Sequence, residues 1–243
     1  MAAATACKTT HTSSSTEGWN YFCEVLEGGD SFSGKYVKLG ANISITQSAG
    51  SDDHRFMGTF DGDGKTLTFN YGSEGTPSSD DYIAPFSYTD GATITALHVN
   101  GTIYTQHTHS AGIIGLCYGT TTISNCRSSI NIVSSIDGDG THSGLIACTW
   151  TGSTTNITGC LFDGSIQSAS GHSTNQCGGF VGWRNNTINI TNCLLTADLS
   201  TIDGTSGDYP SCTFVRRNDN TNVIITNSYY TATLGTPPRQ VAP

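Results

Sequence analysis

Ile190-Thr-Asn-Cys193-Leu-Leu195-Thr-Ala-Asp-Leu199 is the stretch that decides the fold, because four other stretches of the 243-residue chain repeat its pattern. Each copy starts with an isoleucine, has a small or apolar residue at its fourth position and has an aliphatic residue nine positions after the start. The starting isoleucines recur at intervals of 29 to 35 residues, at Ile94, Ile123, Ile157, Ile190 and Ile225. A period of this length predicts a solenoid in which one repeat forms one coil.

A second block precedes each copy. In the three central repeats it consists of a glycine, two apolar residues and a small residue: Gly112-Ile-Ile-Gly115, Gly144-Leu-Ile-Ala147 and Gly179-Phe-Val-Gly182. This block resembles the GLUG-motif repeats of large bacterial surface and adhesin-like proteins, with Gly144-Leu-Ile-Ala147 as the best match and about residues 56–234 covered. The resemblance implies a structural repeat module that is secreted or lies on the bacterial cell surface. It carries over no catalytic residue.

The repeats predict short strands that Gly, Asn and Asp interrupt at turns. Such strands bury a face only when successive coils stack at about 4.8 Å. We therefore expect an all-β, right-handed parallel β-helix of about six coils, with the handedness that parallel crossovers prefer. Equivalent residues then form one interior ladder, and its cysteines are either free core residues or disulfide partners. The ladder contains Leu97, Cys126, Cys160, Cys193 and Ser228.

Four segments follow from this pattern. Residues 1–15 are expected to be a disordered or expression-derived tail, and residues 16–55 a capping helix with the first strands. Trp19, Phe22 and Leu26 have helical spacing and are expected to cover the open end of the first coil. Residues 56–235 form the β-helix repeats, and residues 236–243 form a proline-rich linker to the rest of a larger multidomain protein.

Charge and hydropathy limit the classes of binding partner that the chain can have. The net charge of −9 comes from 10 basic and 19 acidic residues, and we find no cluster of Lys and Arg. Such a surface repels phosphates, so nucleic acid is not an expected partner. No stretch has the eighteen or so apolar residues of a membrane span. The expected location, extracellular or on the bacterial cell surface, rests on the family resemblance.

Aromatic residues fall into two columns when the glycine blocks are aligned. Tyr118 and Trp150 occupy one column on neighbouring coils. A row of such rings offers flat apolar faces with polar rims, which suit stacking against a glycan chain. The alternative is that the rings pack at a corner of the coil. The other column contains Tyr88, Leu116, Cys148 and Trp183.

The segments that absorb the variation in repeat length are residues 104–111, 133–143, 167–178 and 200–212. In repeat proteins such segments often form the binding face. Three histidines in them, each followed by serine, are candidate ligand-binding residues: His109, His142 and His172. Metal binding and simple solvation remain the alternatives.

Two Asp-Gly-Asp-Gly turns contain the pairs Asp61 and Asp63, and Asp137 and Asp139. Alternating carboxylates of this kind can bind calcium, or they can serve only as turn residues. No other cofactor is expected.

These observations favour a non-enzymatic module that binds glycan, or a host or cell-surface protein, outside the cell. One alternative is a carbohydrate-active β-helix enzyme, a lyase or a hydrolase, which needs a cluster of carboxylates that the sequence does not assemble. Another is a spacer or a protein-binding adhesin domain, because the fold alone does not choose among these functions.

Overall fold

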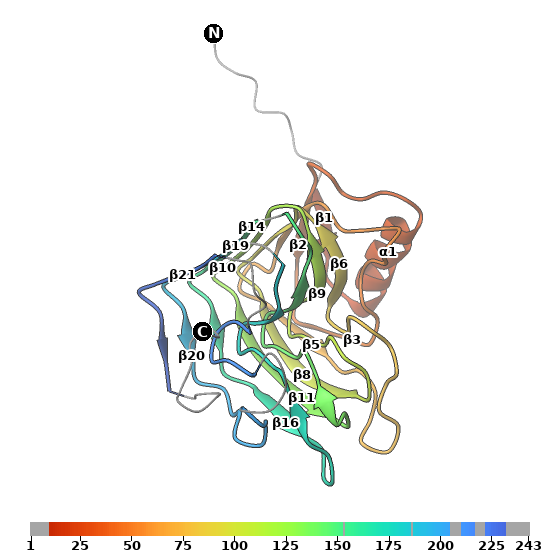
Figure 1. Cartoon of the computed structure of the whole chain (residues 1–243). Coiled ribbons are helices and arrows are strands. Elements are labelled where there is room, and N and C mark those ends of the chain that lie inside the picture. The colour runs from red at the N-terminus through yellow and green to blue at the C-terminus, as the bar shows by residue number, and fades with distance from the viewer. Residues whose placement is uncertain (1–9, 153, 186, 205–209, 217–221, 232–243) are drawn as a thin grey trace.

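The computed structural model describes residues 10–152, 154–185, 187–204, 210–216 and 222–231. In this part of the chain, parallel strands stack into a β-solenoid of about five turns, against about six expected, with one short helix at its N-terminal end. Figure 1 shows the coils following one another from the red helix α1 to the blue strands β20 and β21. The all-β parallel β-helix prediction is confirmed.

Three sheets form the sides of the solenoid. Sheet A contains β1 (Thr10–Ser13), β2 (Tyr36–Leu39), β4 (Thr59–Asp61), β7 (Thr93–Thr95), β10 (Thr121–Ser124), β14 (Thr154–Thr158), β19 (Thr187–Thr191) and β21 (Val223–Thr226). Sheet B contains β3 (Ile43–Ile45), β5 (Thr66–Phe69), β8 (His98–Thr105), β11 (Arg127–Ser134), β15 (Leu161–Phe162), β16 (Ser165–Ser168), β20 (Leu194–Leu195) and β22 (Tyr229–Tyr230). Sheet C contains β6 (Phe86–Asp90), β9 (Ile114–Tyr118), β13 (Ile146–Thr149) and β18 (Val181–Trp183). A small outer pair is formed by β12 (Gly138–Asp139) and β17 (Thr174–Asn175).

The strand register matches the repeat found in the sequence. The five repeat isoleucines pair in order along sheet A, and Phe60 of β4 pairs with the first of them, Ile94. The interior ladder is also confirmed, because Arg127 N–H donates to the Leu97 carbonyl and the equivalent bonds recur on each later coil. Its cysteines are free and buried, as are all eight cysteines in the described ranges.

The residue before each ladder position explains a second feature of the repeat. At this corner the backbone has φ between 47° and 64°, in the left-handed region where asparagine and glycine have the lowest cost. Asparagine or glycine fills the position in four of the five copies, and Ala96 fills it in the first. The corner residues are Ala96, Asn125, Gly159, Asn192 and Asn227.

Helix α1 (Thr16–Glu27) closes the N-terminal end of the core. Ser15 caps it, because its side chain accepts a hydrogen bond from the backbone N–H of Gly18. Trp19, Phe22 and Leu26 are fully buried, as predicted. Burial of each such side chain contributes about 1.5–3 kcal/mol to the free energy of unfolding.

Strand β1 corrects the expected segment boundaries. Residues 10–13 pair with β2, which adds a strand to sheet A within the stretch 1–15 where a tail was expected. Residues 1–9 and the proline-rich stretch 236–243 lie outside the described residues. In the described part of the chain, no helix has the length and apolar character needed to cross a membrane.

Candidate functional site

The outer face of sheet C carries the aromatic residues expected to form columns. The register confirms both columns, since it pairs Cys117 with Thr149 and so places Tyr118 and Trp150 side by side on adjacent coils. Their ring centroids are 5.2 Å apart, and the ring planes are tilted by 34°. The other column runs through Tyr88, Leu116, Cys148 and Trp183 on successive coils.

The second column does not continue the aromatic platform. Leu116 and Cys148 separate its two aromatic members and are buried. The Tyr88 ring packs against Tyr82 with centroids 5.3 Å apart, and the guanidinium carbon of Arg216 lies 4.5 Å from the Trp183 ring centroid. The rings of Tyr88 and Trp183 therefore pack against other side chains, as the alternative of corner packing predicts. Only Tyr118 and Trp150, among these four aromatic residues, lie side by side.

Arg55 packs against the Tyr118 ring. Its guanidinium carbon lies 3.4 Å from the Tyr118 ring centroid, a close cation–π contact. Arg55 Nη2 donates to Asp52 Oδ1 at 2.6 Å, and the Tyr118 hydroxyl donates to the same oxygen at 3.1 Å. The hydrogen bond from Arg55, helped by that from Tyr118, lowers the pKa of Asp52, so this carboxylate is charged at neutral pH. Burial, followed by the bond to Asp52, raises the pKa of Tyr118.

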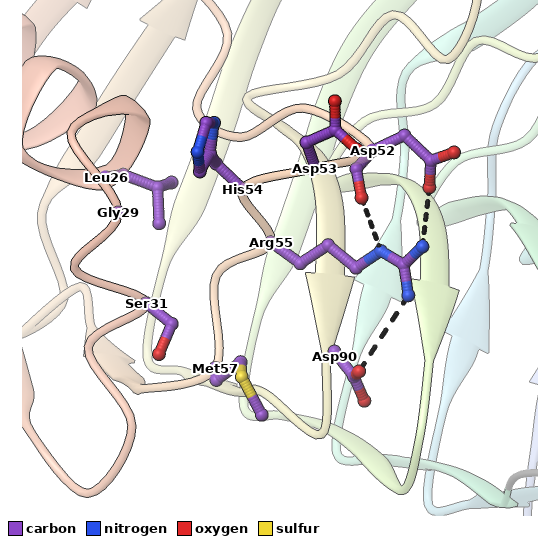
Figure 2. A pocket seen from close by; sticks show the side chains of 9 residues that line it. All are labelled: Leu26, Gly29, Ser31, Asp52, Asp53, His54, Arg55, Met57 and Asp90. Atoms are coloured by element: carbon purple, nitrogen blue, oxygen red, sulfur yellow. Dashed lines mark hydrogen bonds and ion pairs between the residues drawn. The ribbon is translucent and has the colours of Figure 1, made fainter.

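A cavity of about 240 Å³ lies beside Arg55, between the end of α1 and the segment that carries Asp52 and Arg55. Arg55 spans its wall and comes within 3.9 Å of Asp90, which occupies the coil before Tyr118. Figure 2 shows the Arg55 guanidinium between the two carboxylates, with His54 and Met57 on the other side. Charged oxygens, a cation and aromatic faces thus lie together, which is the mixture that recognises a polyhydroxylated molecule.

Sequence reasoning missed Arg55 and Asp52. Both lie in residues 50–57, which precede the aligned repeats and have no equivalent in them. The only available signal was the charged run Asp52-Asp53-His54-Arg55 in a chain with 12% charged residues.

The three candidate histidines do not share one role. His109 Nδ1 donates to the Asp81 carboxylate at 2.7 Å, and the His109 ring stacks on Tyr82 with centroids 4.6 Å apart. His172 lies on the exposed side, 3.5 Å from Asp137. His142 is fully buried, so its expected place on an exposed binding face is wrong. Its two ring nitrogens contact the hydroxyls of Ser110 and Ser134 at 2.8 and 2.9 Å.

The burial of His142 predicts acid sensitivity. Burial, followed by the electrostatic interaction with His109, lowers the pKa of His142 to about 3, whereas an unfolded histidine titrates near 6.5. The unfolded chain therefore binds a proton first, and the stability due to neutral His142 is present above about pH 6.5 and is lost as the pH falls toward 3. We expect the difference in unfolding free energy between the wild type and His142→Asn to shrink over this range.

Urea denaturation at pH values from 7.5 to about 4 measures this difference. An unchanged difference across the range would rule out His142 as the acid-sensitive group.

The aspartates of the two Asp-Gly-Asp-Gly turns form ion pairs and hydrogen bonds within the chain. Asp63 lies 3.1 Å from Lys38 and 3.5 Å from Lys65, and Asp61 accepts the Asp63 backbone N–H at 2.8 Å. Asp137 accepts a backbone N–H at 2.9 Å, and Asp139 pairs with Arg216 at 2.7 Å. In the described ranges, no group of three or more His, Cys, Asp or Glu side chains is arranged to hold a metal ion. Calcium binding stays a prediction.

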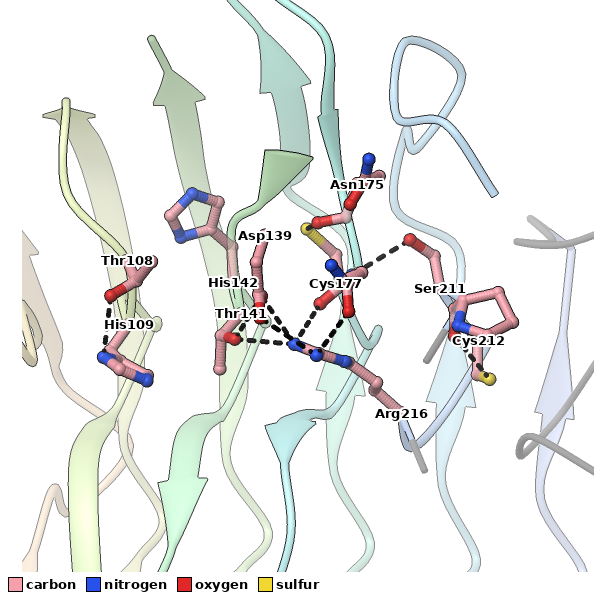
Figure 3. Close-up of polar contacts among 12 residues, drawn as sticks. Thr108, His109, Asp139, Thr141, His142, Asn175, Cys177, Ser211, Cys212 and Arg216 are labelled. Atoms are coloured by element: carbon pink, nitrogen blue, oxygen red, sulfur yellow. Dashed lines mark hydrogen bonds and ion pairs between the residues drawn. The ribbon is translucent and has the colours of Figure 1, made fainter. Parts of the chain in front are cut away.

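A buried arginine organises the segments around Asp139. Arg216 Nη1 donates to Asp139 Oδ1, Thr141 Oγ1 and the Gln176 carbonyl at 2.7, 2.7 and 2.8 Å. Nη2 donates to Asp139 Oδ2 and Gln176 Oε1 at 3.1 and 2.8 Å. Figure 3 shows the guanidinium reaching into this polar cluster from the last coil. The fork joins three successive coils.

Burial keeps the thiols of sheet C protonated. It raises the pKa of Cys117 to about 11 and that of Cys148 to about 12. A buried, protonated thiol is a poor nucleophile, so these two cysteines are structural.

The comparison with solved structures agrees on the fold. The chain is similar to a "putative immunoglobulin A1 protease from Bacteroides ovatus", with a TM-score of 0.57 and 17% sequence identity. The match covers 92% of this chain and 75% of that chain. No family model and no curated protein matches. The β-helix repeat architecture is thus supported, while the GLUG resemblance stays a prediction.

Proposed function

We propose that this protein binds glycan at the outer face of sheet C, as a non-enzymatic module that acts outside the cell. The observation that carries the proposal is the Tyr118–Trp150 pair, in which Trp150 is 50% exposed and the Arg55 guanidinium lies over one face of the Tyr118 ring. Exposed aromatic rings on a rigid sheet can stack against a sugar without a large loss of side-chain entropy.

The groups beside the rings support the same chemistry. The charged carboxylates of Asp52 and Asp90 can accept hydrogen bonds from sugar hydroxyls, and Arg55 can donate to ring or hydroxyl oxygens. The register places Asp90, Tyr118 and Trp150 on three successive coils, so a glycan lying along the solenoid axis meets a polar end and an aromatic end. The cavity next to Arg55 can take a branch or a terminal sugar.

Trp150→Ala is expected to weaken glycan binding about tenfold, because removal of a half-exposed stacking ring costs roughly 1.4 kcal/mol of binding free energy. The purified chain is first screened on a glycan array, with and without calcium. The affinity of each variant for the best hit is then measured by calorimetry.

Tyr229→Ala is the matched control, because Tyr229 is an aromatic residue with 64% exposure that lies on sheet B. Equal losses for both variants would remove the site from sheet C. A blank array would instead favour a spacer or a protein-binding adhesin domain, and release of oligosaccharides over time would favour the carbohydrate-active enzyme.

The structural neighbour adds one probe to the panel. Immunoglobulin A1, named in the description of that neighbour, can be offered as a glycoprotein target. Retention that depends on Trp150 supports glycan binding, whereas cleavage of the antibody chain would replace the proposal with a protease function.

A further inference from the structure

Four polar side chains form a hydrogen-bonded chain on the outer face of sheet B. Thr66 Oγ1 lies 3.2 Å from His98 Nδ1, and His98 Nε2 lies 3.0 Å from Ser129 Oγ. Ser129 Oγ donates to Asp163 Oδ1 at 2.6 Å. The four residues come from β5, β8, β11 and the turn after β15, which are consecutive coils of the sheet. This group lies apart from the sheet C face.

The direction of the protons follows from the carboxylate end. An ionised carboxylate only accepts hydrogen bonds, so the single proton of Ser129 points at Asp163. Ser129 Oγ must then accept from His98, which places the imidazole proton on Nε2. The lone pair of His98 Nδ1 is left facing Thr66, whose hydroxyl donates to it. This is the order nucleophile, base and orienting group.

Asp163 and His98 are each held in the protonation state that this order requires. Arg127 binds Asp163 in a fork, with Nε at 3.0 Å and Nη2 at 2.5 Å from Oδ2. Burial alone would raise the pKa of Asp163, but the hydrogen bonds from Arg127 and Ser129 outweigh it and lower this pKa. Burial and the positive charge of Arg127 lower the pKa of His98. His98 is therefore neutral at pH 7 and can accept a proton.

The strands hold this arrangement in place. Leu67, Val99 and Phe162 alternate with the polar residues along their strands and are fully buried in the core. The outward side chains are thus fixed at the spacing of the coils. Asn42 Oδ1 accepts the backbone N–H of Thr66 at 2.8 Å, which brings the Asn42 amide to the same position.

We propose that Thr66 and His98 form a hydrolytic site for carboxylic esters. Thr66 Oγ1 bonds to the acyl carbon while its proton passes to His98 Nδ1; the bond from the acyl carbon to the alcohol oxygen breaks, and the alcohol leaves with that proton. Water then gives a proton to His98 and attacks the acyl-threonine. Thr66 recovers the proton, and the carboxylic acid is released.

An ester is the substrate class that this geometry suits. The site lies on an open sheet face, and the amide of Asn42, whose Oδ1 accepts the Thr66 backbone N–H, is the group we assign to the developing oxyanion. Esters need less oxyanion stabilisation and less help for the leaving group than amides do. Ser129, Asp163 and Arg127 are positioning residues, because they act only through the imidazole.

The test uses the full chain and p-nitrophenyl acetate. The wild type is expected to release nitrophenol at least 100-fold faster than Thr66→Val and His98→Gln, the size of a typical general-base contribution. Thr66→Ser should retain activity. Mass spectrometry of the quenched reaction should find the acetyl group on the peptide that contains Thr66.

Thr68→Val is the matched control, since Thr68 lies on the same strand and the same face but outside the hydrogen-bonded chain. Ser129→Ala should lower kcat and leave KM unchanged, and a circular dichroism spectrum equal to that of the wild type would exclude a loss of fold as the cause. Equal rates for Thr66→Val and Thr68→Val, or an acetyl group on another residue, would overturn the proposal. A wild-type rate equal to that of buffer would overturn it as well.

Discussion

Gly144→Ala is expected to lower the free energy of unfolding by about 3 kcal/mol or more. A Cβ atom at this position would lie 2.3 Å from Cγ and 2.4 Å from Cδ1 of the Phe162 ring. Such distances require a shift, yet Phe162 is fully buried in the core and has no open space to enter. The glycine of the repeated block is thus needed because the facing side chain of sheet B fills the space above it.

Urea denaturation of Gly144→Ala measures this loss. Gly75→Ala is the control, because a Cβ at Gly75 meets nothing within 4 Å, and a change within about 0.5 kcal/mol is expected there. Phe162→Ala opens space for the new methyl group, so the double variant Gly144→Ala/Phe162→Ala should be more stable than the sum of the single losses predicts. Additive losses would show that the ring contact is not the cause.

Arg216→Met is expected to cost about 3–4 kcal/mol of unfolding free energy. Its guanidinium is fully buried and makes five hydrogen bonds to Asp139, Thr141 and Gln176, each worth roughly 0.5–1.5 kcal/mol net. Removal leaves the polar groups of Thr141 and Gln176 without these bonds. Because the Asp139 side chain is 43% exposed, water can solvate its carboxylate, so the full penalty of an isolated buried charge does not apply.

Thermal and urea unfolding of Arg216→Met measure the effect. Arg127→Met is the matched control, since Arg127 also forks onto a carboxylate but has a side chain with 52% exposure. Exposed pairs of this kind contribute about 0–1 kcal/mol. Arg216→Lys should recover only part of the loss, because one ammonium cannot replace the planar fork. A loss below 1 kcal/mol for Arg216→Met would contradict the structural role.

Aligning the repeats was sufficient to find side-by-side neighbours within the coils. In a parallel solenoid, residues that align in the sequence also lie on top of one another in space, so the spacing of Ile190 and its equivalents specified the strand register. The same rule found the Cys126–Cys160–Cys193 ladder and the Tyr118–Trp150 pair. Helical spacing was enough to find the cap, because Trp19, Phe22 and Leu26 form one apolar face.

The contacts of side chains outside the aligned repeats were determined only by the tertiary structure. Arg55 and Tyr118 are far apart in the chain, and Arg216 and Asp139 are 77 residues apart, so no repeat relates either pair. His142 lies in a segment of variable length that was expected to be exposed, yet it is buried against the hydroxyls of Ser110 on the preceding coil and Ser134 on its own coil. Alignment specifies which backbones stack. The directions of long polar side chains from irregular segments depend on partners that only the folded coils bring within reach.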